Sequence, residues 1–162
     1  MGRCADPVAV KIISRSSARG ELDDAPDMEV ESAQQQAFAL EADLRDFLAN
    51  NLHTIELGLK LYEDGDRSGV EYSIDGGRID ILALDNSGTP VVIELKLSRG
   101  RNHTIGQLLY YMGWVDQNLG KGQSRGMIIA REISDELVLA TQRVAGVLLF
   151  KYAVSLSVSR VQ

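Results

Sequence analysis

The sequence predicts an α/β fold, in which a mixed central β-sheet is flanked by helices. Apolar residues recur at helical spacing in two well-separated segments, 37–51 and 103–119. Between and after them lie short alternating or continuous apolar runs, which are typical of strands. The chain has 162 residues, of which 44% are hydrophobic and 25% charged, enough for one domain with its own core.

Residues 1–36 differ in composition from the rest of the chain. They are rich in Ser, Gln, Asp and Glu and contain two of the three prolines, Pro7 and Pro26. Such a segment has little apolar surface to bury, so we expect a polar, flexible N-terminal arm. Residues 37–162 form the predicted domain.

The elements of this domain can be assigned in order. Leu40, Leu44, Phe47 and Leu48 predict an amphipathic first helix. Ser134 is a good helix cap, with acids in the turn that follows it. The expected elements are a helix over 37–51, strands over 57–62, 70–74, 78–85 and 90–97, a helix over 103–119, a strand over 126–130, a helix after Ser134 and a strand over 147–158. The strand, helix and strand between residues 91 and 130 should form a right-handed parallel crossover.

The hairpin over residues 78–96 carries the residues of chemical interest. Side chains alternate along a strand, so Glu94 and Lys96 share one face. If the loop is centred on Ser87, Asp80 lies opposite Glu94 with the Cβ atoms about 5 Å apart. A bulge at Gly88 would shift this register by one residue.

Two carboxylates facing each other in a partly dry site repel each other strongly. Either one of them takes up a proton or a cation lies between them. Hard oxygen ligands favour Mg²⁺ or Mn²⁺ over zinc. The alternative is a structural cluster in which Lys96 neutralises the pair, but charged side chains are rarely buried without a reason.

Two further groups remain open to interpretation. Glu41 lies at the flank of the apolar stripe of the first helix, where it either reaches a metal site or remains a surface charge. The second helix has a core stripe of Ile105, Leu108, Leu109, Met112 and Val115, and a different side formed by Gln107, Tyr110, Tyr111 and Trp114. These side chains could hold a phosphate and stack on bases, or equally they could pack under a loop or form a subunit interface.

Charge and composition exclude several classes. The net charge of −6 argues against a large non-specific DNA-binding surface, although a local excess of bases follows the hairpin: Arg99, Arg101, Lys121, Arg125 and Arg131, against Asp116. A basic stretch is as often a solvated face. There is no histidine spacing for zinc, no G-x-S-x-G motif and only one cysteine. No membrane-spanning run or secretory signal is visible, so we expect a cytoplasmic protein.

The stretch GGRIDILALDNSGTPVVIELK, residues 76–96, resembles the catalytic motif of PD-(D/E)XK nucleases, an Asp followed by Glu-x-Lys on the next strand. Together with IGQLLYYMGWV at 105–115, it is similar to the C-terminal nuclease domain of the NucS, or EndoMS, endonucleases. The likeness extends over residues 41–131. It implies a restriction-endonuclease-like fold with an αβββαβ core.

The resemblance also implies roles at a metal site. Asp80 and Glu94 would bind Mg²⁺, with Mn²⁺ as a substitute, and the Leu95 carbonyl would be a further ligand. Glu41 matches an acidic residue that completes the site directly or through water. Lys96 would orient or activate the attacking water. One metal or two is left undecided.

Substrate contacts follow in the same way. Gln107 matches the motif glutamine of the helix after the third strand, with Tyr111 nearby. Arg78 stands where a family basic residue touches the scissile phosphate, and we assign Arg99 and Arg101 of the basic stretch to substrate binding.

The expected function is therefore a metal-dependent DNA endonuclease, in repair of mismatched or branched DNA or in genome defence. The alternatives are a non-catalytic DNA-binding module, or a partner subunit whose aromatic face forms a homodimer interface. The similar endonucleases carry a separate N-terminal DNA-binding domain, which residues 1–36 do not match, and a tail for a sliding clamp, for which 155–162 show no clear motif.

Overall fold

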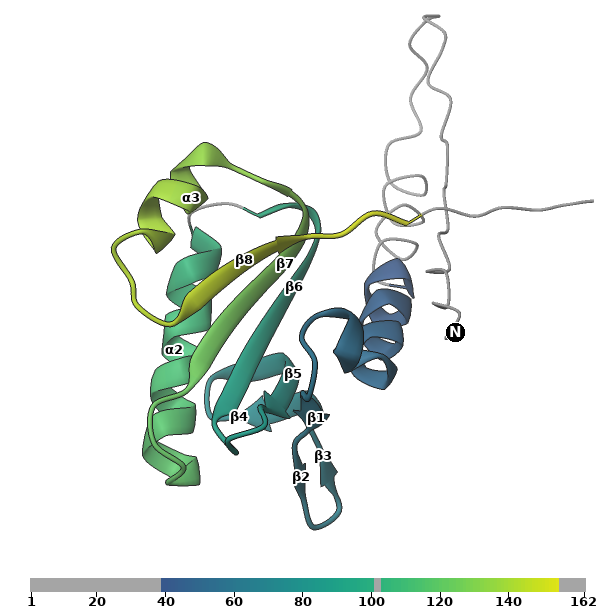
Figure 1. Cartoon of the computed structure of the whole chain (residues 1–162), viewed down its shortest axis with the longest axis vertical. Coiled ribbons are helices and arrows are strands. Elements are labelled where there is room, and N and C mark those ends of the chain that lie inside the picture. The colour runs from purple at the N-terminus through teal and green to yellow at the C-terminus, as the bar shows by residue number, and fades with distance from the viewer. Residues whose placement is uncertain (1–38, 101–102, 155–162) are drawn as a thin grey trace, which may run out of the picture.

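A six-stranded mixed sheet with helices on both faces forms the centre of the molecule (Figure 1). The computed structural model describes residues 39–100 and 103–154. The sheet order is β1-β5-β6-β7-β8, and β4 also pairs with β5. Its strands are β1 (Lys60–Leu61), β4 (Val70–Ile74), β5 (Gly77–Leu84), β6 (Pro90–Gly100), β7 (Arg125–Ile133) and β8 (Val147–Lys151). The predicted α/β class is confirmed.

The helices cover the two faces of the sheet separately. α2 (His103–Leu119) and α3 (Asp135–Thr141) lie on one side, and the helix that includes residues 39–50 lies on the other, followed by a short 3-10 turn, Leu52–Thr54 (Figure 1). Accordingly there are two core clusters. One contains Leu108 and Met112 of α2, and the other contains Leu48 of the first helix. None of the described helices is long and apolar enough to cross a membrane.

The strand pairing agrees with the sequence analysis at the positions that matter most. β5 and β6 are antiparallel, with Ile81 opposite Ile93 and Leu84 opposite Pro90, so the hairpin is centred on Ser87 as predicted. β6 and β7 are parallel and are connected through α2, which confirms the expected parallel pairing. Ser134 caps α3 by accepting a hydrogen bond from the Leu137 amide, as predicted.

Other expectations need correction. Leu40 and Phe47 are about half exposed, so the buried face of the first helix is narrower than the predicted stripe and is built around Leu44 and Leu48. On α2, Tyr111 is buried in the core while Leu109 is partly exposed. A short ribbon of β2 (Glu63–Asp64) and β3 (Arg67–Ser68) was not predicted. The last strand, expected over 147–158, ends at Lys151, and residues 152–154 are not in a strand. The expected arm over 1–36 and residues 155–158 lie outside the described residues.

Candidate active site

The candidate site lies where β5 and β6 separate. Ile81 and Ile93 are the last pair in their shared ladder. Beyond this point β6 continues beside β7 as far as Gly100, while β5 continues beside β4 as far as Gly77. Asp80 and Glu94 are the next residues on the two strands, and so they stand at the start of the opening between them.

Asp80 bridges this opening with its side chain. Its Oδ2 accepts a hydrogen bond from the Leu95 amide at 2.7 Å, so a carboxylate replaces the carbonyl that a strand neighbour would offer. The direction of β5 also changes here. Ile79 belongs to the cluster under α2, whereas Ile81 belongs to the cluster under the first helix, although residues two apart normally share a face. The strand therefore twists sharply at Asp80.

Glu94 is almost completely enclosed, with 1% of its surface exposed. Its Oε1 accepts a hydrogen bond from Lys96 Nζ. Its Oε2 is buried and has no partner among the described residues. Lys96 is about a quarter exposed, so the ammonium group connects the buried carboxylate to the open side of the site. A buried carboxylate oxygen without a partner costs free energy unless another group coordinates it.

The electrostatics of the site reflect this enclosure. Burial, followed by the charge of Asp80, raises the pKa of Glu94 to about 7. Burial also raises the pKa of Asp80, although the Leu95 hydrogen bond and the charge of Lys96 act in the opposite direction. For Lys96, burial lowers the pKa, but the contact with Glu94 outweighs it and the net shift is upward. The site therefore holds two carboxylates that ionise with difficulty and a lysine that retains its proton.

Glu41 faces this site from the first helix. Burial and then the charge of Asp80 raise its pKa, whereas Lys96 and Arg45 lower it. Of the two interpretations left open by the sequence, the structure supports an inward-facing Glu41, close enough to Asp80 and Lys96 for their charges to shift its pKa. Arg45 lies one helical turn further on the same face.

The second-helix candidates contact each other and the start of β5. Gln107 Nε2 donates to Tyr111 Oη at 3.1 Å, and the tyrosine is 6% exposed. A Cβ at Gly77 would lie only 2.7 Å from this hydroxyl, so Tyr111 packs against the start of β5. Within the described residues, no hydrogen bond or ion pair joins Gln107 or Tyr111 to the acidic pair. Arg99 is exposed beyond an irregularity in β6, and Arg101 lies outside the described residues.

The donor set suits a hard divalent cation. Mg²⁺ is usually bound through one or two carboxylates and keeps several waters, so a complete protein cage is not required. Asp80 and Glu94 supply the carboxylates, and Glu94 Oε2 is free to coordinate. Across residues 39–100 and 103–154, no group of three or more His, Cys, Asp or Glu side chains is placed so that it could hold a metal ion, so two carboxylates are the acidic donors brought together here.

Arg45 and Glu71 were not identified from the sequence. Arg45 could have been found, because it follows Glu41 by four residues on the same helix. Glu71 gave no signal, because its place beside Asp80 depends on an unusual backbone conformation.

A mixed sheet with a buried Glu beside a partly buried Asp and Lys, where two strands separate, is the arrangement expected of a nuclease-like α/β domain. The sequence matches the family described as endonuclease NucS C-terminal domain over residues 40–147. The chain therefore belongs to this family.

Relatives and solved structures agree with this assignment. The chain is 31% identical over 109 residues to an endonuclease NucS of Sulfurisphaera tokodaii, covering 67% of this chain and 40% of the relative. It is 32% identical over 114 residues to one of Streptomyces avermitilis, covering 70% and 48%. The chain thus spans less than half the length of these relatives.

Similar folds occur in a repair endonuclease from Pyrococcus abyssi, with a TM-score of 0.58, 22% identity, and coverage of 82% of this chain and 50% of that one. An EndoMS–dsDNA complex gives a TM-score of 0.57 and 23% identity, covering 86% and 49%. These structures confirm the fold.

Proposed function

We propose that the chain is a metal-dependent DNA endonuclease that hydrolyses phosphodiester bonds. The observation that carries this proposal is the buried Glu94 carboxylate, held by Lys96 on one oxygen and without a partner on the other. A carboxylate that only stabilised the fold would have both oxygens satisfied. Membership of an endonuclease family supports the same reaction class.

Asp80 and Glu94 would hold Mg²⁺, or Mn²⁺ in its place, with the Leu95 carbonyl and Glu41 as further oxygen ligands, directly or through water. When bound, the cation supplies Lewis-acid activation of the phosphate and a water of lowered pKa. Lys96 donates a hydrogen bond to Glu94 Oε1 and is partly open to solvent. From there its ammonium group orients the attacking water and offsets charge that develops on the phosphate.

The substrate is proposed to be DNA that is mismatched or branched, cut during repair or defence in the cytoplasm. The similar solved structures support DNA and repair, since one is an EndoMS–dsDNA complex and another a repair endonuclease. We assign Arg78, Arg99 and Arg101 to the DNA backbone, and Gln107 and Tyr111 to the wall of the site. A homodimer and recruitment by a sliding clamp remain predictions.

Cleavage of a labelled DNA panel tests this proposal. Duplex, mismatched, flapped and single-stranded DNA would be incubated with Mg²⁺, Mn²⁺ or chelator, using wild type beside Asp80→Ala. We expect cutting that requires the metal and falls by about 10³-fold in the variant, the scale of losing one preorganised charge contact. Asp64→Ala, which removes an exposed carboxylate on the small ribbon, is the matched control and should cut like wild type.

Cutting that persists in chelator, or in Asp80→Ala at the wild-type rate, would contradict the assigned site. DNA that is bound but never cut would instead favour the non-catalytic module. The substrate cut fastest would decide between repair of mismatches and processing of branches.

A further inference from the structure

One carboxylate beside the site holds two arginines at once. Glu71 Oε1 accepts a hydrogen bond from Arg45 Nη1 at 2.8 Å and lies 3.1 Å from Arg78 Nη1. Arg45 comes from the first helix and Arg78 from β5, so Glu71 on β4 connects elements that meet at the opening. This group lies outside the Asp80, Glu94 and Lys96 cluster already described.

The backbone at Glu71 is unusual. With φ of 48° it is, among the described residues, the one non-glycine residue in the left-handed region. It lies between Val70, which pairs with Ile81, and Tyr72, which pairs with Ile79, and is therefore opposite Asp80. Strained conformations of this kind persist only where the surroundings fix them, and they concentrate at functional sites. Here the conformation places the Glu71 carboxylate within reach of both arginines and near enough to Asp80 for its charge to raise the pKa of Asp80.

The two arginines are held very differently. Arg45 is 15% exposed and also donates through Nε and Nη2 to Asp46, so its guanidinium is fixed on two sides. Arg78 is 60% exposed, and Glu71 is its one charged contact in the described part of the chain. An exposed ion pair is weak, whereas a guanidinium binds a phosphate through two parallel hydrogen bonds. Arg78 can therefore leave Glu71 at little cost when a phosphate arrives.

We propose that Glu71 is an internal competitor for the DNA backbone: it holds Arg78 in the free protein, and a phosphodiester displaces it on binding. Arg45 keeps Glu71 in position during this exchange. The inference rests on the proposed function for the identity of the ligand, and it adds a residue that restrains DNA binding rather than promoting it. It also accounts for an acidic side chain at a place where a polyanion should bind.

The exchange predicts opposite effects from its two partners. Glu71→Gln should bind DNA about 2–5-fold more tightly, the fold-change expected from removing one exposed ion pair. Arg78→Ala should bind more weakly, and the slope of log affinity against log salt should fall by about one phosphate contact. The double variant should bind like Arg78→Ala alone, because without Arg78 there is no guanidinium for Glu71 to withhold from the DNA.

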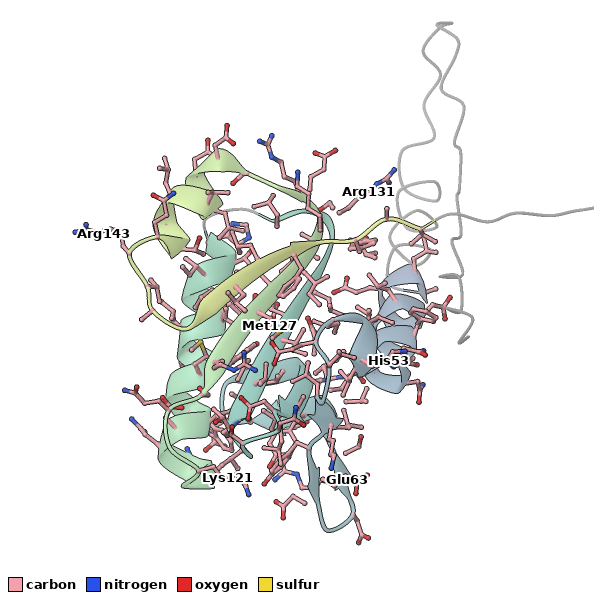
Figure 2. All side chains as sticks on the ribbon, in the orientation of Figure 1. His53, Glu63, Lys121, Met127, Arg131 and Arg143 are labelled. Carbon is pink, nitrogen blue, oxygen red and sulfur yellow. The ribbon has the colours of Figure 1, made fainter. Side chains whose placement is uncertain are left out.

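Fluorescence anisotropy with a labelled DNA duplex in chelator would measure these affinities, with a denaturing gel to verify that the DNA is intact. Asp46→Asn is the matched acidic control, because Asp46 contacts Arg45 but not Arg78. Arg143→Ala is the basic control, since Arg143 lies by α3 on the other side of the sheet from the first helix (Figure 2). Both should leave the affinity within about 2-fold of wild type, below the effect of one exposed pair.

Four results would overturn the inference: unchanged affinity in Glu71→Gln, weaker binding by Glu71→Gln, an equal gain in the Arg78→Ala background, or an equal gain in Asp46→Asn. The last two would show a general loss of negative charge. Cleavage with Mg²⁺, run in parallel, separates this outcome from failure of the proposed function. If the wild type cuts DNA but Glu71→Gln shows no gain in affinity, the proposed function stands and the inference fails. If Glu71→Gln shows the gain but the wild type never cuts, the inference stands and the proposed function fails.

Discussion

Two aspartates on the same hairpin have opposite environments. Asp85, at the closed end, accepts hydrogen bonds from the Ser87 and Thr89 amides at 2.9 and 3.0 Å, and its other oxygen lies 3.2 Å from Arg125. Asp80, at the open end, accepts one amide hydrogen bond and faces another carboxylate.

Their pKa values move in opposite directions for this reason. Desolvation raises the pKa of Asp85, but the Thr89 and Ser87 hydrogen bonds and the charge of Arg125 outweigh it, and the net shift is downward. Burial dominates at Asp80 and raises its pKa. At the closed end an ionised aspartate thus stabilises the hairpin, whereas at the open end burial disfavours the ionised form of the aspartate. On the proposed function, Asp85 would serve the fold and Asp80 the chemistry, since perturbed pKa values concentrate at functional sites.

The largest expected effect is on metal binding. If Asp80 and Glu94 are ligands, saturating Mg²⁺ should stabilise wild type by about 2.7 kcal/mol at a concentration one hundred times Kd. For a domain of this size that raises Tm by about 5–10 °C. Thermal unfolding with Mg²⁺ or chelator would measure the shift.

Asp80→Asn should abolish that shift, whereas Asp85→Asn, which keeps a similar shape, should retain it in full. An equal Mg²⁺ response in both variants would mean that the cation binds elsewhere. A loss in both would mean that the closed end of the hairpin also contributes to the site.

The next effect is on the metal-free fold. Asp85→Ala removes two amide hydrogen bonds to a charged acceptor and one ion pair with Arg125, so we expect a loss of about 2 kcal/mol in the free energy of unfolding. Asp80→Asn should be nearly neutral or stabilising, because it relieves repulsion in a buried pair. Urea unfolding in chelator would compare them. Equal destabilisation by both substitutions would show that the two acids serve the fold alike.

Much of this comparison was predictable from the sequence. The hairpin centre at Ser87 and the pairing of β5 with β6 follow from a short loop between two strongly apolar strands. Glu94 and Lys96 could be placed together because alternation in a strand has a fixed period.

The remaining features depend on tertiary contacts. The exposure of Leu40 and Phe47 could not be predicted, because a helical stripe shows which residues are apolar but not how much of it the sheet covers. The twist at Asp80 and the left-handed backbone at Glu71 arise where β4, β5 and β6 compete for partners. Periodicity in a single strand carries no information about that competition.

The smallest expected effect is a change with pH, because Lys96 offsets part of the cost at the open end. The folded pKa of Asp85 lies below its unfolded value of about 3.9, so its contribution to stability is present above that pH and is lost as the pH falls through the folded pKa. The difference in unfolding free energy between wild type and Asp85→Ala should therefore shrink below about pH 4.

Glu94 has the opposite sign: its folded pKa of about 7 favours the folded state at acid pH, and this contribution is lost as the pH rises through that value. In chelator, Glu94→Gln should therefore gain stability relative to wild type between about pH 4.5 and 7, the window between the unfolded and folded pKa values. Urea unfolding at a series of pH values would measure both slopes, and slopes of the same sign would remove the contrast between the two ends of the hairpin.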